Sequence, residues 1–161
     1  MSDTCNLTID TAEQMRDLGE WLGSRFTAGD VVVLNGELGA GKTTLTQGIG
    51  KGMGVQEPIT SPTFVIARQH VIPKADPALA LLHIDAYRLG SAAELDDLGT
   101  DWDSSVAVIE WGAGIVDDFA FTPLFLDIRA NDADVRTITV QSPHDRWSPL
   151  ITELRETSWA S

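Results

Sequence analysis

The sequence predicts an α/β fold whose sheet is parallel in the middle and antiparallel at one edge. Strand and helix patterns alternate through the first half of the chain. A continuous apolar run at residues 31–34 is typical of a strand buried on both faces of a parallel sheet. Near the C-terminus, strand patterns at 124–129 and 135–141 flank the turn 130–134, which predicts a hairpin.

The first elements are a short strand at residues 6–9 and a helix that begins after it. Thr11 and Gln14 have the spacing of a capping box, in which the Thr hydroxyl accepts a hydrogen bond from the backbone N–H three residues later. Apolar residues then recur at spacings of three and four, as on the buried face of a helix: Met15, Leu18, Leu22 and Phe26. This strand and helix end before the apolar strand at 31–34.

A second helix is expected from about Lys42, with an apolar face formed by Leu45, Ile49 and Met53. Three glycines inside it each lower its stability by about 1 kcal/mol relative to Ala, so most of its stability must come from tertiary packing. They are Gly48, Gly50 and Gly52. Further along, the sequence predicts strands at 64–71, 79–84 and 106–109, a short acidic helix at 92–98 and a terminal helix at 146–157.

Length and composition predict one globular domain over residues 1–161. The 43% apolar and 22% charged residues are ordinary values for a folded protein. The N-terminus lacks the basic and apolar segments of a secretory signal, and no stretch reaches the roughly 18 apolar residues of a membrane span. The single cysteine, Cys5, excludes an internal disulfide. We therefore expect a cytoplasmic protein without membrane contact.

The charge argues against direct binding to nucleic acid. The chain has 24 acidic and 11 basic side chains, a net charge of −13. The excess is uneven, because residues 94–118 contain eight acids and no base. Such a surface repels a phosphate backbone. If the protein serves a nucleic-acid pathway, we expect it to act through a protein partner.

The most specific motif lies between the first buried strand and the helix that follows it. Residues 36–44 satisfy the pattern G-x-x-x-x-G-K-T of a phosphate-binding loop. Glycines let several backbone N–H groups converge on phosphates, and the helix N-terminus adds partial positive charge. Lys42 would neutralise the β- and γ-phosphates, and the Thr43 hydroxyl would ligate Mg²⁺. The candidate nucleotide-binding residues are Gly36, Glu37, Leu38, Gly39, Ala40, Gly41, Lys42, Thr43 and Thr44.

Two acidic residues that follow apolar strand patterns are candidates for a second metal-binding position. Asp85 follows Leu-Leu-His-Ile, and Glu110 follows Val-Ala-Val-Ile. An acid at the carboxyl end of a strand points into the crevice where ligands of open α/β sheets bind. Strand alternation places His83 on the same face as Asp85, where a structural role is the simpler interpretation.

Four motifs together resemble those of a known family. Besides the loop, they are Ser-Pro-Thr-Phe at 61–64, His-Ile-Asp-Ala-Tyr-Arg-Leu at 83–89 and Glu-Trp at 110–111. In this order and spacing the chain resembles the TsaE family, small bacterial ATPases of tRNA threonylcarbamoyladenosine biosynthesis. The resemblance runs from about Leu18 to Gln141. It implies a three-layer fold like that of P-loop NTPases, Mg-ATP as cofactor, and action beside the TsaB–TsaD pair, which transfers the threonylcarbamoyl group to tRNA.

The resemblance also implies roles for single residues. By motif match, Thr43 and Glu110 would hold the metal, with Asp85 beside them. Trp111 would lie near the nucleotide, and Thr63 would lie in a switch-like loop that responds to the γ-phosphate. With Lys42, these residues form the candidate catalytic set. After Trp111 the chain departs from the family pattern, because Gly-Ala-Gly stands where a further acid is usual.

Phosphate loops also occur in proteins other than ATPases. A GTPase would need N/T-K-x-D to read guanine, and in the nearest string, 73–76, proline replaces the asparagine. The string 96–99 satisfies D-x-x-G, but it ends an acidic helix instead of following a strand. A small-molecule kinase would need clustered arginines to clamp the transferred phosphoryl group, and this sequence lacks them. Arg136 could reach a phosphate from the predicted hairpin, but an exposed strand arginine is the simpler account. The sequence does not separate a non-hydrolysing nucleotide sensor from an ATPase.

No glutamine or arginine in the motifs is an obvious water-orienting residue or arginine finger. We therefore expect slow hydrolysis by the protein alone and faster hydrolysis in the complex.

Overall fold

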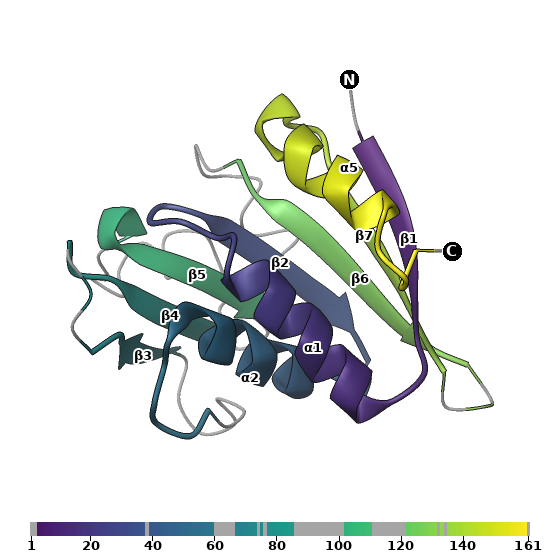
Figure 1. The fold of residues 1–161 in the computed structure, drawn as a ribbon. Coiled ribbons are helices and arrows are strands. Elements are labelled where there is room, and N and C mark those ends of the chain that lie inside the picture. The colour runs from purple at the N-terminus through teal and green to yellow at the C-terminus, as the bar shows by residue number, and fades with distance from the viewer. Residues whose placement is uncertain are drawn as a thin grey trace.

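The computed structural model describes residues 3–37, 39–59, 67–73, 75, 77–85, 102–110, 122–131, 133 and 135–160. Its strands form one seven-stranded sheet in the order β1-β7-β6-β2-β5-β4-β3 (Figure 1). In chain order the strands are β1 (Asp3–Ile9), β2 (Val31–Gly36), β3 (Ala67–Val71), β4 (Ala80–Asp85), β5 (Ser105–Glu110), β6 (Leu124–Ala130) and β7 (Arg136–Ser142).

The α-helices of the described residues cover one face of this sheet (Figure 1). They are α1 (Ala12–Gly23), α2 (Lys42–Met53) and α5 (Ser148–Arg155), with short 3₁₀ helices at Trp102–Ser104 and Asp145–Trp147. The core under the helices joins Leu18, Leu45 and Leu154 to Val32 of β2. A second cluster on the opposite face includes Val33, the neighbour of Val32 in the same strand. The apolar run at 31–34 is therefore buried on both faces, as predicted.

The predicted α/β class and the parallel centre of the sheet are confirmed. The strands β6, β2, β5 and β4 run parallel to one another, while β7 pairs antiparallel with β6, and β1 pairs antiparallel with β7. Antiparallel pairing also occurs at the other edge, where β3 pairs with β4. The sequence predicts antiparallel pairing at one edge only. The connection from β3 to β4 is too short to cross over the sheet, and it forces the two strands to run antiparallel.

The helix boundaries follow local signals. The Thr11 hydroxyl accepts a hydrogen bond from the Gln14 N–H at 3.0 Å, and the Gln14 side chain accepts one from the Asp10 N–H at 2.8 Å. The predicted capping box is therefore present, with its return bond one residue earlier than usual. The terminal helix is shorter than predicted, because 3₁₀ geometry occupies Asp145–Trp147 before α5 begins. The predicted acidic helix at 92–98 lies outside the described residues.

Glycines set the distance between α1 and α2. A Cβ atom at Gly48 of α2 would lie 2.3 Å from the Arg16 carbonyl oxygen of α1, and one at Gly52 would lie 2.2 Å from that of Glu20. Gly19 and Gly23 of α1 face the backbone of α2 in the same way. The glycines that weaken α2 as an isolated helix thus let the two backbones touch, and this close packing brings the start of α2 against α1.

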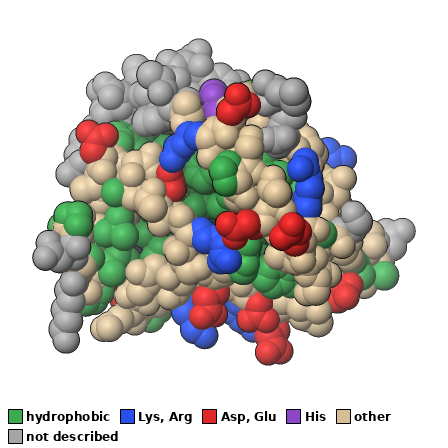
Figure 2. Space-filling model, turned by 45° about the horizontal axis from the view of Figure 1, so that its top comes forward, with side chains coloured by type: hydrophobic (Ala, Val, Ile, Leu, Met, Phe, Trp, Pro, Cys, Tyr) green, Lys and Arg blue, Asp and Glu red, His purple; other side chains and the backbone are tan. Residues whose placement is uncertain are grey.

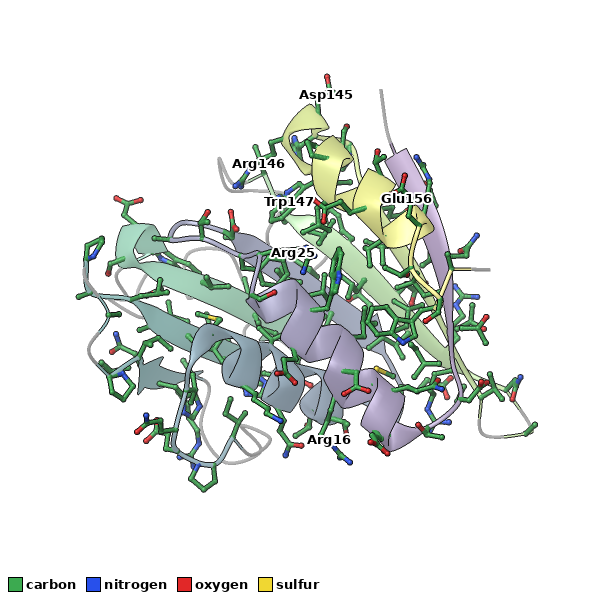
Figure 3. The ribbon with its side chains drawn as sticks, in the orientation of Figure 1. Arg16, Arg25, Asp145, Arg146, Trp147 and Glu156 are labelled. Atoms are coloured by element: carbon green, nitrogen blue, oxygen red, sulfur yellow. The ribbon has the colours of Figure 1, made fainter. Side chains whose placement is uncertain are left out.

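The C-terminal segment is held to the end of α1 (Figure 3). Arg146 forms an ion pair with the buried carboxylate of Asp30. The ring of Trp147 meets that of Phe26 edge to face, with centroids 6.0 Å apart, and its N–H donates to the Thr122 carbonyl oxygen at 2.7 Å. Arg25 at the end of α1 pairs with Glu153 of α5 at 2.9 Å. These contacts fix α5 on the same face as α1.

On the face that Figure 2 presents, basic side chains are interspersed with acidic ones, and no continuous basic stripe crosses the residues described there. None of the helices in the described part of the chain is long and apolar enough to span a membrane.

Candidate functional site

The predicted phosphate loop joins the end of β2 to the start of α2. Gly39 and Gly41 have φ angles of +81° and +111°, a region of backbone conformation that residues other than glycine rarely adopt. Gly41 is also the N-cap of α2, where no side chain caps the first turn. The N–H groups at this helix start are therefore not covered by a capping side chain and can receive an anion.

Lys42 is held beneath this loop. The residue is only 6% exposed, and its amino group donates to the carbonyl oxygens of Gly36 at 2.5 Å and Glu37 at 3.2 Å. Burial lowers the pKa of this amino group, and the negative charges of Glu110 and Asp85 oppose that shift. The cation thus lies within the field of both predicted metal-binding acids.

The two candidate acids lie side by side at the carboxyl ends of neighbouring parallel strands. Asp85 ends β4 and Glu110 ends β5, and the two residues are in register. Glu110 is also in register with Leu34 of β2, just before the phosphate loop. The strand ends therefore bring both acids to the edge of the sheet where the loop begins, as expected for a ligand crevice.

Glu110 is buried and is hydrogen-bonded to a buried histidine. It is 5% exposed, and its Oε2 atom lies 2.7 Å from Nε2 of His83, which is fully buried. β4 is a continuous strand over Ala80–Asp85, so His83 shares the face of Leu81, which packs under the helices, and not the face of Leu82. The contact with Glu110 is a feature that alternation alone could not predict.

The candidate metal ligands suit Mg²⁺ by their chemistry. Thr43 supplies a hydroxyl oxygen, and Asp85 and Glu110 supply carboxylate oxygens, which are the hard donors that Mg²⁺ prefers. Within the described ranges, no cluster of three or more His, Cys, Asp or Glu side chains could hold a metal on its own. In proteins Mg²⁺ is usually shared between one or two carboxylates, substrate phosphates and water.

Two pockets flank the loop. One, of about 400 Å³, lies between the start of α1, the start of α2 and β7. It is lined by Ile9, Asp10, Thr11, Ala12, Met15, Gly39, Gly41, Thr44 and Arg136. The other, of about 470 Å³, lies between the loop and residues 127–130 of β6.

Arg136 supports the phosphate loop from the first of these pockets. Its Nε atom donates to the Ala40 carbonyl oxygen at 3.0 Å, and a terminal nitrogen donates to that of Gly39 at 3.3 Å. The simpler account from sequence, an exposed strand arginine, is therefore wrong. The contact spans 96 positions along the chain. It depends on the strand order, because β1 and β6 flank β7, and no local signal in the sequence reveals it.

The comparison with known families and structures agrees with this geometry. The family described as threonylcarbamoyl adenosine biosynthesis protein TsaE matches residues 9–138. The chain belongs to the TsaE family. It is 48% identical over 141 residues to the tRNA threonylcarbamoyladenosine biosynthesis protein TsaE of Streptomyces coelicolor, a match that covers 83% of this chain and 94% of that protein. The TsaE protein of Bacillus subtilis is 36% identical over 145 residues, 88% of each chain.

A solved structure extends the likeness to the fold. The crystal structure of Bacillus subtilis YdiB superposes with a TM-score of 0.76 at 29% identity and covers 97% of each chain. The resemblance to the TsaE family noted from the four motifs is thus confirmed. Of the residues to which that resemblance assigns a role, Thr63 and Trp111 lie outside the described residues, as does Leu38 of the loop.

Proposed function

We propose that the protein binds Mg-ATP at residues 36–44 and hydrolyses it slowly, as a cytoplasmic ATPase that works beside the TsaB–TsaD pair. Its family supports a role in the biosynthesis of threonylcarbamoyladenosine in tRNA. One observation carries the nucleotide assignment: the glycine loop, the Lys42 amino group and the carboxylates of Asp85 and Glu110 converge at one edge of the sheet. The pair, rather than this acidic chain, would contact the tRNA.

Each group has a defined task in this proposal. Loop and helix N–H groups bind phosphate oxygens, and Lys42 exchanges the carbonyl oxygens of Gly36 and Glu37 for phosphate oxygens. Thr43, Asp85 and Glu110 hold the metal. Bound Mg²⁺ would neutralise charge that develops on the transferring phosphoryl group. We expect a partner to stimulate hydrolysis.

The nucleoside is assigned to the pocket beside Arg136. This pocket opens onto Gly41 and Thr44 at the start of α2, where the phosphates would bind, and it offers the Thr11 hydroxyl and the Arg136 guanidinium as polar groups. We expect Arg136→Ala to weaken ATP binding about tenfold, or ~1.4 kcal/mol, the size of a hydrogen bond from a charged group.

Arg129→Ala is the matched control for that titration. Arg129 lies on the neighbouring strand, lines the other pocket and has a side chain that is 80% exposed. We expect its replacement to leave ATP affinity unchanged when both variants are titrated by calorimetry. Loss of affinity in Arg129→Ala but not in Arg136→Ala would assign the nucleoside to the pocket beside β6.

The structure weakens the GTPase alternative. Pro73, the first residue of the string nearest to a guanine-reading motif, follows β3 in the connection to β4. It therefore precedes the start of β4 at Ala80, whereas the phosphate loop lies near the carboxyl end of that strand. The strand alone separates the two ends by roughly 16 Å, at about 3.3 Å per residue. A guanine-reading asparagine at position 73 would be at the wrong end of the sheet.

Glu110→Gln tests the metal assignment. Loss of a group that only holds a metal ligand in place typically weakens metal binding by roughly 10–100-fold. Because Glu110 would bind the metal itself, we expect a larger rise in the Mg²⁺ concentration that half-saturates the ATP complex. Binding of ATP in EDTA should change little, because the loop and Lys42 remain. The control is Glu57→Gln, since Glu57 also contacts a buried histidine, His70, at 2.6 Å but lies beyond the far end of α2. An unchanged Mg²⁺ midpoint in Glu110→Gln would remove Glu110 from the metal site.

The proposed function is tested by calorimetric titration of the purified protein with ATP and GTP, with and without Mg²⁺. We expect ATP to bind, Mg²⁺ to strengthen that binding, and GTP to bind more weakly. Absence of ATP binding under both conditions would overturn the proposal.

A further inference from the structure

A buried histidine contacts the candidate metal ligand Glu110 and has no part in the function proposed so far. His83 lies in β4 in register with Val108, two residues before Glu110 in β5. Alternation along the two strands places both side chains on the face of Leu81 and Val108, which is the face covered by α2. Their contact, 2.7 Å between Nε2 and Oε2, therefore bridges two strands at the edge where the phosphate loop begins.

The direction of this hydrogen bond follows from the groups involved. An ionised carboxylate can only accept, so the proton lies on Nε2 of His83. The other ring nitrogen, Nδ1, is buried and has no hydrogen-bond partner among the residues that the structure describes. With the proton on Nε2, Nδ1 has only an acceptor lone pair, and no N–H of the ring is left unpaired in the core.

We infer that His83 is a positioning residue: its Nε2–H fixes one oxygen of the Glu110 carboxylate and thereby orients the other oxygen for Mg²⁺. This inference rests on the proposed function, because it concerns the same metal site. The last torsion of a glutamate side chain is broad, so hydrogen bonds decide how the carboxylate plane is turned. Groups that hold a metal ligand in place commonly change metal affinity by about 10–100-fold.

A second histidine–glutamate contact in the molecule serves as an internal comparison. His70 Nδ1 lies 2.6 Å from Glu57 Oε1, but the Glu57 side chain is 56% exposed. Glu57 lies after the C-terminal end of α2, whereas the phosphate loop lies before the N-terminal end of this helix. The two pairs share their chemistry, and only the pair at the strand ends lies beside Lys42 and Asp85.

The test measures metal binding directly, with Mn²⁺ as the probe in the presence of ATP and electron paramagnetic resonance as the readout. His83→Leu removes the donor at similar volume, and we expect it to raise the half-saturating Mn²⁺ concentration about tenfold or more. His83→Gln keeps an N–H near the position of Nε2, and we expect it to restore most of the affinity. ATP binding in EDTA should be the same in all three proteins.

A double-mutant cycle with Glu110→Gln separates positioning from a role in folding. If His83 acts through Glu110, His83→Leu causes little further loss of Mn²⁺ affinity in the Glu110→Gln background, where the phosphates still bind the ion. A residue needed only for folding would lower the Tm while leaving the Mn²⁺ midpoint unchanged, as we expect for the control His70→Leu.

Two results would overturn the inference. One is an unchanged Mn²⁺ midpoint in His83→Leu, which would leave the proposed function standing if the wild-type protein binds Mg-ATP. The other is an equal loss of ATP affinity with and without metal. Absence of ATP binding in the wild-type protein would instead remove the proposed function and this inference together.

Discussion

Replacing Lys42 with alanine is expected to lower the affinity for ATP about 100-fold or more, which corresponds to ~2.8 kcal/mol. Lys42 is the side-chain cation at the phosphate loop, and its hydrogen bonds to phosphate would be charge-assisted. Its removal should not unfold the protein. Burial lowers the pKa of the Lys42 amino group, which means that the fold disfavours its charged form. Calorimetric titration with ATP, together with a thermal melt, measures both effects.

Lys51→Ala provides a matched control on the same helix. Lys51 lies in the last turn of α2, its side chain is 75% exposed, and it contacts Glu20 at 3.7 Å. An exposed pair of this kind contributes little to stability, so ATP affinity and Tm should both stay near the wild-type values. Equal ATP affinity in Lys42→Ala and Lys51→Ala would contradict the assignment of residues 36–44 as the nucleotide site.

Gly48→Ala is expected to destabilise the protein by about 2 kcal/mol or more, although alanine favours helix by about 1 kcal/mol over glycine. The added Cβ would lie 2.3 Å from the Arg16 carbonyl oxygen and 2.9 Å from the Gly19 Cα atom. Both atoms belong to the α1 backbone, so relief requires the two helices to move apart. The shift would be read from urea denaturation followed by circular dichroism.

Gly50→Ala separates this packing effect from helix propensity. Gly50 lies in the same helix, but a Cβ there meets the Cδ1 atom of Ile59 at 2.2 Å, the end of a flexible side chain that can turn away. We expect a clearly smaller loss of stability than for Gly48→Ala. A Gly48→Ala protein as stable as the wild type would show that α1 and α2 do not depend on backbone contact.

Local patterns predicted the elements of the fold because their causes are local. The apolar run 31–34 identified β2 as a strand buried on both faces, and Thr11 marked the start of α1. The pairing of β3 was not predicted, since strand direction depends on the turn that follows. The contact between α1 and α2 has a signal in the sequence, because Gly19 and Gly23 repeat the spacing of Gly48 and Gly52 and so give each helix a small face at which the other can approach.

In the candidate site, too, some features follow from local sequence and others depend on strand order and register. The loop and the strand-end positions of Asp85 and Glu110 follow from residues adjacent in sequence, and parallel strands bring such ends together. The support that Arg136 gives to the loop could not be predicted, because it depends on which strand lies beside β1 and β6. For His83 the face was predictable from alternation, but the bond to Glu110 depends on the register of β4 against β5.

ATP hydrolysis with and without the TsaB–TsaD pair tests the proposal that the protein is a Mg-ATPase acting beside that pair. GTP and the Lys42→Ala variant are the controls. We predict slow turnover by the protein alone, faster turnover with the pair, and no stimulation of Lys42→Ala. Equal turnover with and without the pair, or a preference for GTP, would contradict the account.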